Sequence, residues 1–227
     1  MPLRHKGTKS SLRNFETASS FLGSIIMKKN LKIAITGGIG SGKSLVTSFV
    51  EKLGYPVLKS DEVAKDLMQN DESIREKIIK EFGPPAYSEK VLNTKYLAEN
   101  VFTYPEKVLK INSIVHPPTI RKIDELSNQL FTKHKIVFVE SALIYEAEIQ
   151  DLFDYVILIY SDEQSRIARV MQRERISHTN IEKRMAFQIP DNQKKERADF
   201  VIENNSTIAE LETRTHFILN LLKSFVE

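Results

Sequence analysis

A glycine-rich segment with the pattern G-x-x-x-x-G-K-[ST] constrains this chain more than any other feature. It runs from Gly37 to Ser44 and follows an apolar run, residues 31–36, that is typical of a strand. Behind it, apolar residues recur at helical spacing over residues 45–53. In this context the turn binds phosphate, because main-chain N–H groups converge at a helix N-terminus. An ordinary strand–helix turn is the alternative, and the matching flanks favour phosphate binding.

The residue types within this segment predict how a nucleotide would be held. Glycines let main-chain N–H groups approach phosphate oxygens without an intervening Cβ. The ammonium of Lys43 would reach the β- and γ-phosphates, and the hydroxyl of Ser44 would hold Mg²⁺. The expected nucleotide-binding residues are Gly38, Ile39, Gly40, Ser41, Gly42, Lys43 and Ser44.

Composition is ordinary for a globular protein and excludes several classes. The 227 residues are 41% hydrophobic and 28% charged, and no apolar run approaches the length of a membrane span. There is no Cys, so neither a disulfide framework nor a thiolate zinc site can form. The net charge of +3 resides in residues 1–26, and the remainder is neutral. We therefore expect no binding to nucleic acid or membranes.

Residues 1–26 are rich in Ser, Thr and basic residues. That composition resembles a transit peptide, but the amphipathic pattern of such peptides is missing. The favoured alternative is that Met27 is the natural start and that this leader is an upstream extension. In either case we expect a disordered leader, followed by one domain over residues 27–227.

Strands alternate with helices along the rest of the chain. Further strands are predicted at residues 55–58, 135–139, 155–160 and 199–202, and an amphipathic helix closes the chain. This alternation predicts a three-layer α/β/α sandwich around a parallel sheet. Ligands bind at the carboxyl edge of such sheets, which is where the glycine-rich segment should lie.

Two helical excursions are expected outside this sandwich. Residues 84–134 carry no strong strand signal, and their length exceeds that of a plain crossover, so we expect a substrate-binding insertion. Within it, Asn93 and Pro105 predict helix starts, and Pro117-Pro118 predicts a helix end. A second, polar segment over residues 173–197 is expected to form a mobile helical lid.

Several polar residues are candidates for chemistry. Asp61 follows the second strand at the ligand-binding edge, although a plain helix N-cap explains an Asp there equally well. Glu140 ends the clearest strand, where a carboxylate can hold Mg²⁺ or its water shell. His116 precedes the two prolines, and a lone His more often has a structural role. Arg169 and Arg173 lie one helical turn apart, which suits either a phosphate clamp or a solvated face.

These parts favour a small-molecule kinase over other nucleotide-binding proteins. A guanine-nucleotide switch would carry Asn-Lys-x-Asp after a late strand, and that string does not occur. A motor ATPase would usually be larger. Phosphoryl transfer to a small acceptor needs an acceptor domain, a base, arginines over the phosphate and a flap that excludes water. The insertion, Asp61, the two arginines and the lid segment supply a candidate for each.

A set of motifs resembles the dephospho-coenzyme A (dephospho-CoA) kinase family. Besides the glycine-rich segment and the Asp after strand two, it comprises Val115-His116-Pro117, Ala142-Leu143-Ile144-Tyr145-Glu146, Arg184-Met185-x-x-Gln188 and the run from Ala198 to Asn205. The resemblance implies ATP-dependent phosphorylation of the ribose 3′-hydroxyl of dephospho-CoA, the last step of coenzyme A synthesis. It also implies a five-stranded P-loop kinase core, a helical coenzyme-binding domain and a lid, in a cytoplasmic enzyme that uses Mg²⁺.

The resemblance assigns roles to individual residues. Asp61 falls at the position of the family's base, and Arg173 at that of a phosphate-binding arginine of the lid. The expected site, from residues and resemblance together, has Lys43, Asp61 and Arg173 as catalytic residues, Asp61, His116 and Glu146 at the acceptor, Ser44 and Glu140 at the metal, and Arg169, Asn204 and Asn205 at ATP.

Three positions depart from the family's usual pattern. Lys59 replaces an acid and should alter the electrostatics near the acceptor, Ala142 replaces a Pro, and Leu45 replaces a Thr. The runner-up interpretation is a kinase with the same core that acts on a nucleoside monophosphate or a shikimate-like alcohol. We expect a monomer or a weak homo-oligomer.

Overall fold

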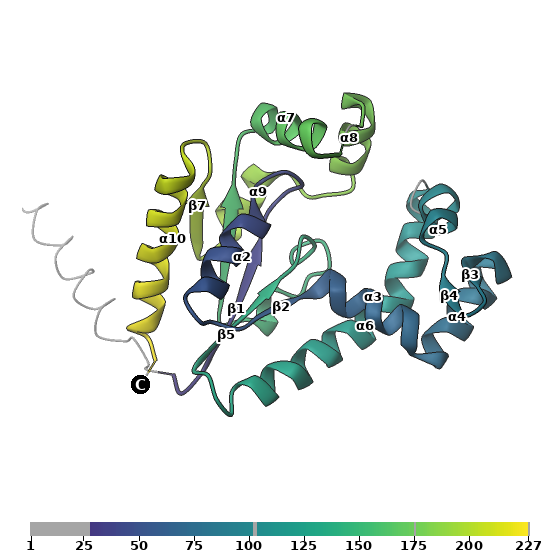
Figure 1. Ribbon diagram of the computed structural model, residues 1–227, viewed down its shortest axis with the longest axis horizontal. Helices are drawn as coiled ribbons and strands as arrows, with labels where there is room; N and C mark the ends of the chain where they lie inside the picture. Colours follow the sequence, from purple (N-terminus) through teal and green to yellow (C-terminus); the bar gives the residue numbers. More distant parts are fainter. Residues whose placement is uncertain (1–27, 102–103, 175, 227) are drawn as a thin grey trace, which may run out of the picture.

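A five-stranded parallel sheet forms the centre of the computed structural model, which describes residues 28–101, 104–174 and 176–226. The predicted leader lies outside the described residues. The strands are β1 (Leu31–Thr36), β2 (Val57–Lys59), β5 (Ile136–Glu140), β6 (Tyr155–Tyr160) and β7 (Phe200–Glu203). They lie in the order β2-β5-β1-β6-β7, and helices cover the sheet on both sides (Figure 1). The predicted α/β sandwich is confirmed.

Alternation along the strands produces two apolar layers. Ile33 and Ile35 of β1 face α2 (Lys43–Lys52) and α10 (Ile208–Lys223), where they join a buried cluster with Val50 and Leu222. Ala34 points to the other side and packs with residues that follow β5. Because full burial of one such aliphatic side chain contributes about 1.5–3 kcal/mol, these layers hold the carboxyl edge of the sheet in place.

A helical arm leaves the sheet after β2 (Figure 1). Its elements are α3 (Ser60–Asn70), α4 (Glu72–Phe82), η1 (Pro84–Ala86), β3 (Tyr87–Ser88), β4 (Val91–Leu92), α5 (Thr94–Asn100) and α6 (Pro105–Leu130). The arm has an apolar core of its own, which includes Leu97 and Ile111. Ile74 and Ile78 of α4 belong to this core, so the packed unit begins before residue 84.

The prediction that Pro117-Pro118 ends a helix is wrong, because α6 continues to Leu130. A proline inside a helix removes a donor and costs about 3 kcal/mol. One face of α6 is nevertheless buried at four-residue spacing through Val115, Thr119 and Ile123. In addition, the Thr119 hydroxyl donates to the carbonyl of Val115 at 2.8 Å. Burial along this face therefore outweighs the local preference of the prolines.

The sequence also carried no sign of the hairpin formed by β3 and β4, which pairs Tyr87 with Leu92. Its turn residues, Glu89 and Lys90, have φ values of 49° and 72°, a conformation that favours Gly or Asn. Gln69 of α3 holds the turn, since its amide donates to the Lys90 carbonyl and accepts from Leu92 N–H, both at 2.9 Å. A tertiary contact thus replaces the usual turn residues.

The remaining elements are η2 (Gln150–Leu152), α7 (Glu163–Glu174), α8 (His178–Met185) and α9 (Asp191–Arg197). Figure 1 shows α7 and α8 beyond the carboxyl ends of the strands. Asp191 and Lys194 of α9 are buried, which differs from the polar flap expected for this segment. Within the described ranges, no helix is both long enough and apolar enough to cross a membrane.

Candidate active site

The glycine-rich segment between β1 and α2, called the phosphate loop below, has a backbone that requires glycine at two positions. Gly40 and Gly42 have φ values of 77° and 100°. A Cβ at Gly42 would lie 2.2 Å from Nδ2 of Asn204. Among the described residues, no protein atom accepts from the main-chain N–H groups of Gly40, Gly42, Lys43 or Ser44. Four neighbouring donors at the start of α2 are therefore available to an anion.

Lys43 lies over this loop. Its Nζ donates to the carbonyl of Gly37 at 2.8 Å and to that of Gly38 at 3.4 Å. Burial lowers the pKa of Lys43, and the carboxylates of Glu140 and Asp61 oppose that shift. A lysine in this position carries its charge beside the free amides, where phosphate oxygens would lie.

Glu140 and Asp61 lie at the same edge of the sheet. Glu140 ends β5 opposite Lys59 of β2, and Asp61 is the second residue of α3, which follows β2 directly. The N-cap position of α3 is Lys59, so the interpretation of Asp61 as an N-cap does not apply. Burial raises the pKa of Glu140, while the charge of Lys43 opposes this shift. The two carboxylates are therefore both within electrostatic reach of Lys43.

His116 approaches this edge from α6. It is half-buried, and burial lowers its pKa, whereas the charge of Asp61 opposes that shift. The arm thus brings His116 into electrostatic reach of Asp61, although 55 positions separate them in the sequence.

The two arginines of α7 have different surroundings. Arg169 donates to Ser161 Oγ at 3.1 Å and to the carbonyl of Asn204 at 2.7 Å. Arg173 is exposed and pairs with Glu174. The structure therefore does not bring the two guanidinium groups together as a clamp. Arg169 contacts the turn after β7, and Arg173 lies in the last turn of α7.

The turn after β7 is attached to the phosphate loop. Asn204 Nδ2 donates to the carbonyl of Ser41 at 2.8 Å. Asn205 Oδ1 accepts from Ser161 Oγ at 2.7 Å and from the N–H of Asp162 at 3.0 Å. Both residues predicted at ATP thus connect β7, the start of α7 and the phosphate loop.

A group of four charged residues beside the loop, three of them buried and Glu146 partly buried, was missed by sequence reasoning. We call Glu146, Arg166, Asp191 and Lys194 the charge cluster. Lys194 Nζ lies 2.7 Å from Glu146 Oε1, and Arg166 Nη1 lies 3.4 Å from Asp191 Oδ2. Glu146, expected at the acceptor, is therefore engaged by Lys194, and its acceptor role stays a prediction. The spacing of Asp191 and Lys194 was a signal for an ion pair, but their burial left no sign in this polar run.

Gln188 is a second residue with a contact that its motif did not assign. Its Oε1 accepts from the N–H of Ile39 in the phosphate loop at 2.9 Å. The next residue, Ile189, donates its N–H to Glu146 Oε1 at 3.0 Å. The segment between α8 and α9 is thereby held against the phosphate loop by Gln188 and against Glu146 by Ile189.

The residues at the sheet edge suit a magnesium ion that is bound chiefly by phosphate and water. Within the described part of the chain, no three His, Cys, Asp or Glu side chains are grouped so that they could hold a metal. Ser44 is the second residue of α2 and lies beside the free amides, and Glu140 is a carboxylate at the end of the neighbouring strand. Mg²⁺ typically keeps several waters and takes one or two protein ligands together with substrate phosphates, so these two residues fit it.

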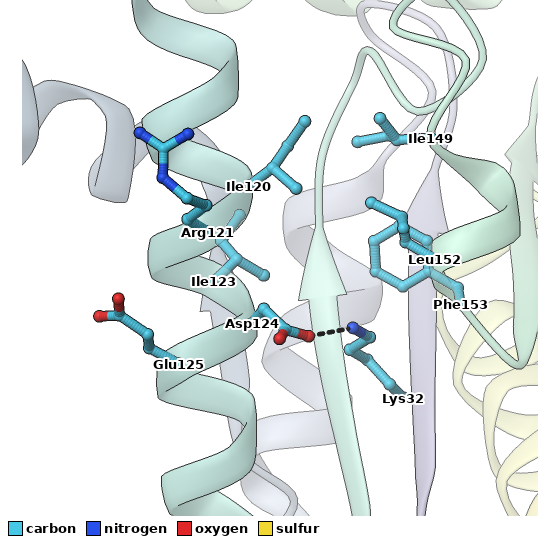
Figure 2. A pocket seen from close by; sticks show the side chains of 9 residues that line it. All are labelled: Lys32, Ile120, Arg121, Ile123, Asp124, Glu125, Ile149, Leu152 and Phe153. Atoms are coloured by element: carbon cyan, nitrogen blue, oxygen red, sulfur yellow. Dashed lines mark hydrogen bonds and ion pairs between the residues drawn. The ribbon is translucent and has the colours of Figure 1, made fainter.

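A cavity of about 420 Å³ lies away from this site, between α6 and the segment before β6 (Figure 2). Its wall is largely apolar and includes Ile120, Ile149 and Phe153, and Lys32 and Asp124 form an ion pair of 2.8 Å at its border. Neither the phosphate loop nor Asp61 contributes to it.

Comparison with known proteins shows one consistent likeness. A family model described as dephospho-CoA kinase matches residues 31–210. A dephospho-CoA kinase of Salinibacter ruber is 36% identical over 81% of this chain and 93% of that protein. Among solved structures, a protein from Thermus thermophilus has a TM-score of 0.73 at 31% identity and covers 86% of this chain and 99% of its own. A dephospho-CoA kinase from Campylobacter jejuni has a TM-score of 0.64 at 27% identity, with 84% and 96% covered.

Proposed function

This chain belongs to the dephospho-CoA kinase family, and from that premise we propose that it transfers the γ-phosphoryl group of ATP to the ribose 3′-hydroxyl of dephospho-CoA. The products are ADP and coenzyme A, and the reaction is the last step of coenzyme A biosynthesis. One observation carries the assignment of residues: free loop amides, Lys43 and Asp61 meet at a single edge of the sheet.

On the nucleotide side, the phosphate loop binds the triphosphate of ATP through the N–H groups of Gly40, Gly42, Lys43 and Ser44. Lys43 moves its ammonium from the loop carbonyls to the β- and γ-phosphates, where it stabilises the charge of the transition state. Asn204 and Asn205 lie in the turn beside this loop and support the nucleotide end of the site. Arg169 supports the loop from behind through the Asn204 carbonyl.

On the acceptor side, Asp61 orients the 3′-hydroxyl and accepts its proton. A bond forms between the 3′-oxygen and the γ-phosphorus while the bond from that phosphorus to the β–γ bridging oxygen breaks, and the bonding electrons leave with ADP. In a loose transition state the proton leaves late, so an ordinary carboxylate is a sufficient base. His116, kept neutral by burial, is available as a hydrogen-bond partner for the acceptor.

The remaining assignments concern charge at the transferred group. Arg173 reaches the γ-phosphoryl group when the lid closes, which also excludes water as a competing acceptor. Ser44 would hold Mg²⁺ directly, and Glu140 would hold it through water. Bound Mg²⁺ supplies neutralising charge at the β- and γ-phosphates.

We further propose a cytoplasmic enzyme that acts as a monomer or weak homo-oligomer and binds no nucleic acid. Residues 84–134 form its coenzyme-binding part, together with α4, and residues 173–197 form its lid. The near-neutral charge of residues 27–227 supports the absence of nucleic-acid binding.

The direct test is an acceptor assay. Purified protein is given ATP and Mg²⁺ with dephospho-CoA, adenosine monophosphate or shikimate, and ADP release is measured beside the mass of the product. We expect ADP and coenzyme A only with dephospho-CoA. ADP release that depended on one of the other acceptors, or on none, would refute the proposed function.

A further inference from the structure

Burying the charge cluster costs desolvation free energy. The side chain of Lys194 is fully buried, and that of Asp191 is 6% exposed. Two buried polar atoms of the cluster, Glu146 Oε2 and Arg166 Nε, have no hydrogen-bond partner in the described chain, and Asp191 Oδ2 and Lys194 Nζ have ion-pair contacts without hydrogen-bond geometry. Buried ion pairs seldom stabilise a fold more than apolar residues of the same size would. Stability alone therefore does not explain the cluster.

The position of the cluster indicates what it does. A Cβ on Gly38 would lie 2.2 Å from Arg166 Nη1 and 2.8 Å from Asp191 Oδ2, so this ion pair packs directly on the phosphate loop. The charges of Lys194 and Asp191 also act on the pKa of Lys43, which Lys194 lowers and Asp191 raises. The cluster is thus a neighbour of the residue that meets the γ-phosphate.

Lys194 connects Glu146 and Asp191 beside the turn of residues 188–191, whose Gln188 contacts the phosphate loop. It lies 2.7 Å from Glu146, and the same carboxylate oxygen of Glu146 accepts from Ile189 N–H at 3.0 Å. On its other side it lies 4.0 Å from Asp191, at the end of the turn. Gln188, the residue before Ile189, accepts from the N–H of Ile39. Lys194 therefore contacts Asp191 at one end of residues 188–191 and reaches Ile189 through Glu146, next to the residue that accepts from the Ile39 amide.

We propose that Lys194 is a positioning residue for phosphoryl transfer: by pairing with Glu146 and Asp191 it fixes residues 188–191 against the phosphate loop and so orients the Ile39 peptide. This role rests on the proposed kinase function. The free N–H groups of Gly40, Gly42, Lys43 and Ser44 make no hydrogen bond to Gln188, so they should bind phosphate without the contact that Lys194 supports. Loss of Lys194 should consequently affect the rate of transfer more than the binding of ATP.

Amide hydrogen exchange tests the structural part of the proposal without any acceptor. In Lys194→Met, exchange of the Ile39 amide should accelerate at least about tenfold, because its acceptor Gln188 is released, while exchange of Ile33 inside β1 should not change. Lys195→Met is the matched control, since Lys195 is the next residue of α9 but is exposed and pairs with Glu203 at 2.8 Å. Unchanged exchange at Ile39 in Lys194→Met would overturn the proposal.

Kinetics tests the catalytic part. We expect kcat of Lys194→Met to fall at least about tenfold, with KM for ATP within about threefold of wild type. Lys194→Met should add little to the loss already caused by Gln188→Ala, because both act through the same hydrogen bond. Fully additive losses, or a changed KM with unchanged kcat, would overturn the positioning role.

A second variant covers the case in which Lys194→Met does not fold. Lys194→Arg keeps the positive charge but not the compact shape of the ammonium, so it should also accelerate exchange at Ile39, and an unchanged rate there overturns the proposal. Failure of the proposed function looks different. A wild-type protein that did not phosphorylate dephospho-CoA would refute that function, whereas the exchange result at Ile39 would stand by itself.

Discussion

Replacing Asn204 by alanine removes one identifiable contact between the turn after β7 and the phosphate loop. The side-chain amide donates to the carbonyl of Ser41 at 2.8 Å, and both residues are buried, with Ser41 at 0% and Asn204 at 7% exposure. The contacts of Arg169 and Ser161 to residue 204 go to its main-chain carbonyl and survive the substitution. The variant therefore isolates the bond to the loop.

The size of the effect follows from the acceptor left behind. No water can reach a fully buried carbonyl without rearrangement, and an unsatisfied buried acceptor costs about 1–3 kcal/mol. For a domain of this length, a loss of about 2 kcal/mol lowers Tm by about 4–8 °C. The loop also loses its support at Gly42, where the amide group of Asn204 packs. A smaller fraction of molecules then holds the binding-competent loop, so the apparent affinity for ATP should fall.

Urea unfolding at an unchanged m-value measures the stability, and calorimetric titration measures the binding of ATP. The matched control is Asn220→Ala on the exposed face of α10, for which we expect a change within about 0.5 kcal/mol. If Asn204→Ala unfolds with a free energy within about 0.5 kcal/mol of wild type, the bond to Ser41 does not support the loop.

Three further predictions test individual groups. Asp61→Asn should lower kcat at least about tenfold with the unfolding free energy unchanged, and turnover within about threefold of wild type, under about 1 kcal/mol, would show that Asp61 is not the base. Burial raises the pKa of Glu140 from 4.5, so the ionised carboxylate destabilises the fold as pH rises through that raised pKa. The unfolding free energy of Glu140→Gln relative to wild type, measured with urea, should therefore increase between about pH 4 and pH 7. A difference in unfolding free energy that did not change with pH would contradict this. Burial also raises the pKa of Tyr145 to about 12, and its hydroxyl has no partner among the described residues, so Tyr145→Phe should lose no more than about 0.5 kcal/mol of unfolding free energy; a loss above about 1 kcal/mol would reveal a hidden partner.

Much of the fold was predictable because its signals are local. The strands β1, β5 and β6 are short apolar runs, and the starts of α5 and α6 carry the expected Asn93 cap and Pro105. Where the predictions failed, a distant contact decided the outcome. A buried face carries α6 through Pro117 and Pro118, and α3 holds the turn of the β3–β4 hairpin.

For the candidate site, the amino-acid sequence by itself predicted the position of the phosphate loop, since its glycines, lysine and serine lie within one short segment. It also located Asp61 and Glu140 at strand ends, which a parallel sheet gathers at one edge. The tertiary structure alone decided which side chains are buried and paired. It placed His116 near Asp61, turned Arg169 toward the Asn204 carbonyl, and enclosed Lys194 with Glu146 and Asp191. Burial and ion pairing join residues that are far apart in the chain, so no local pattern records them.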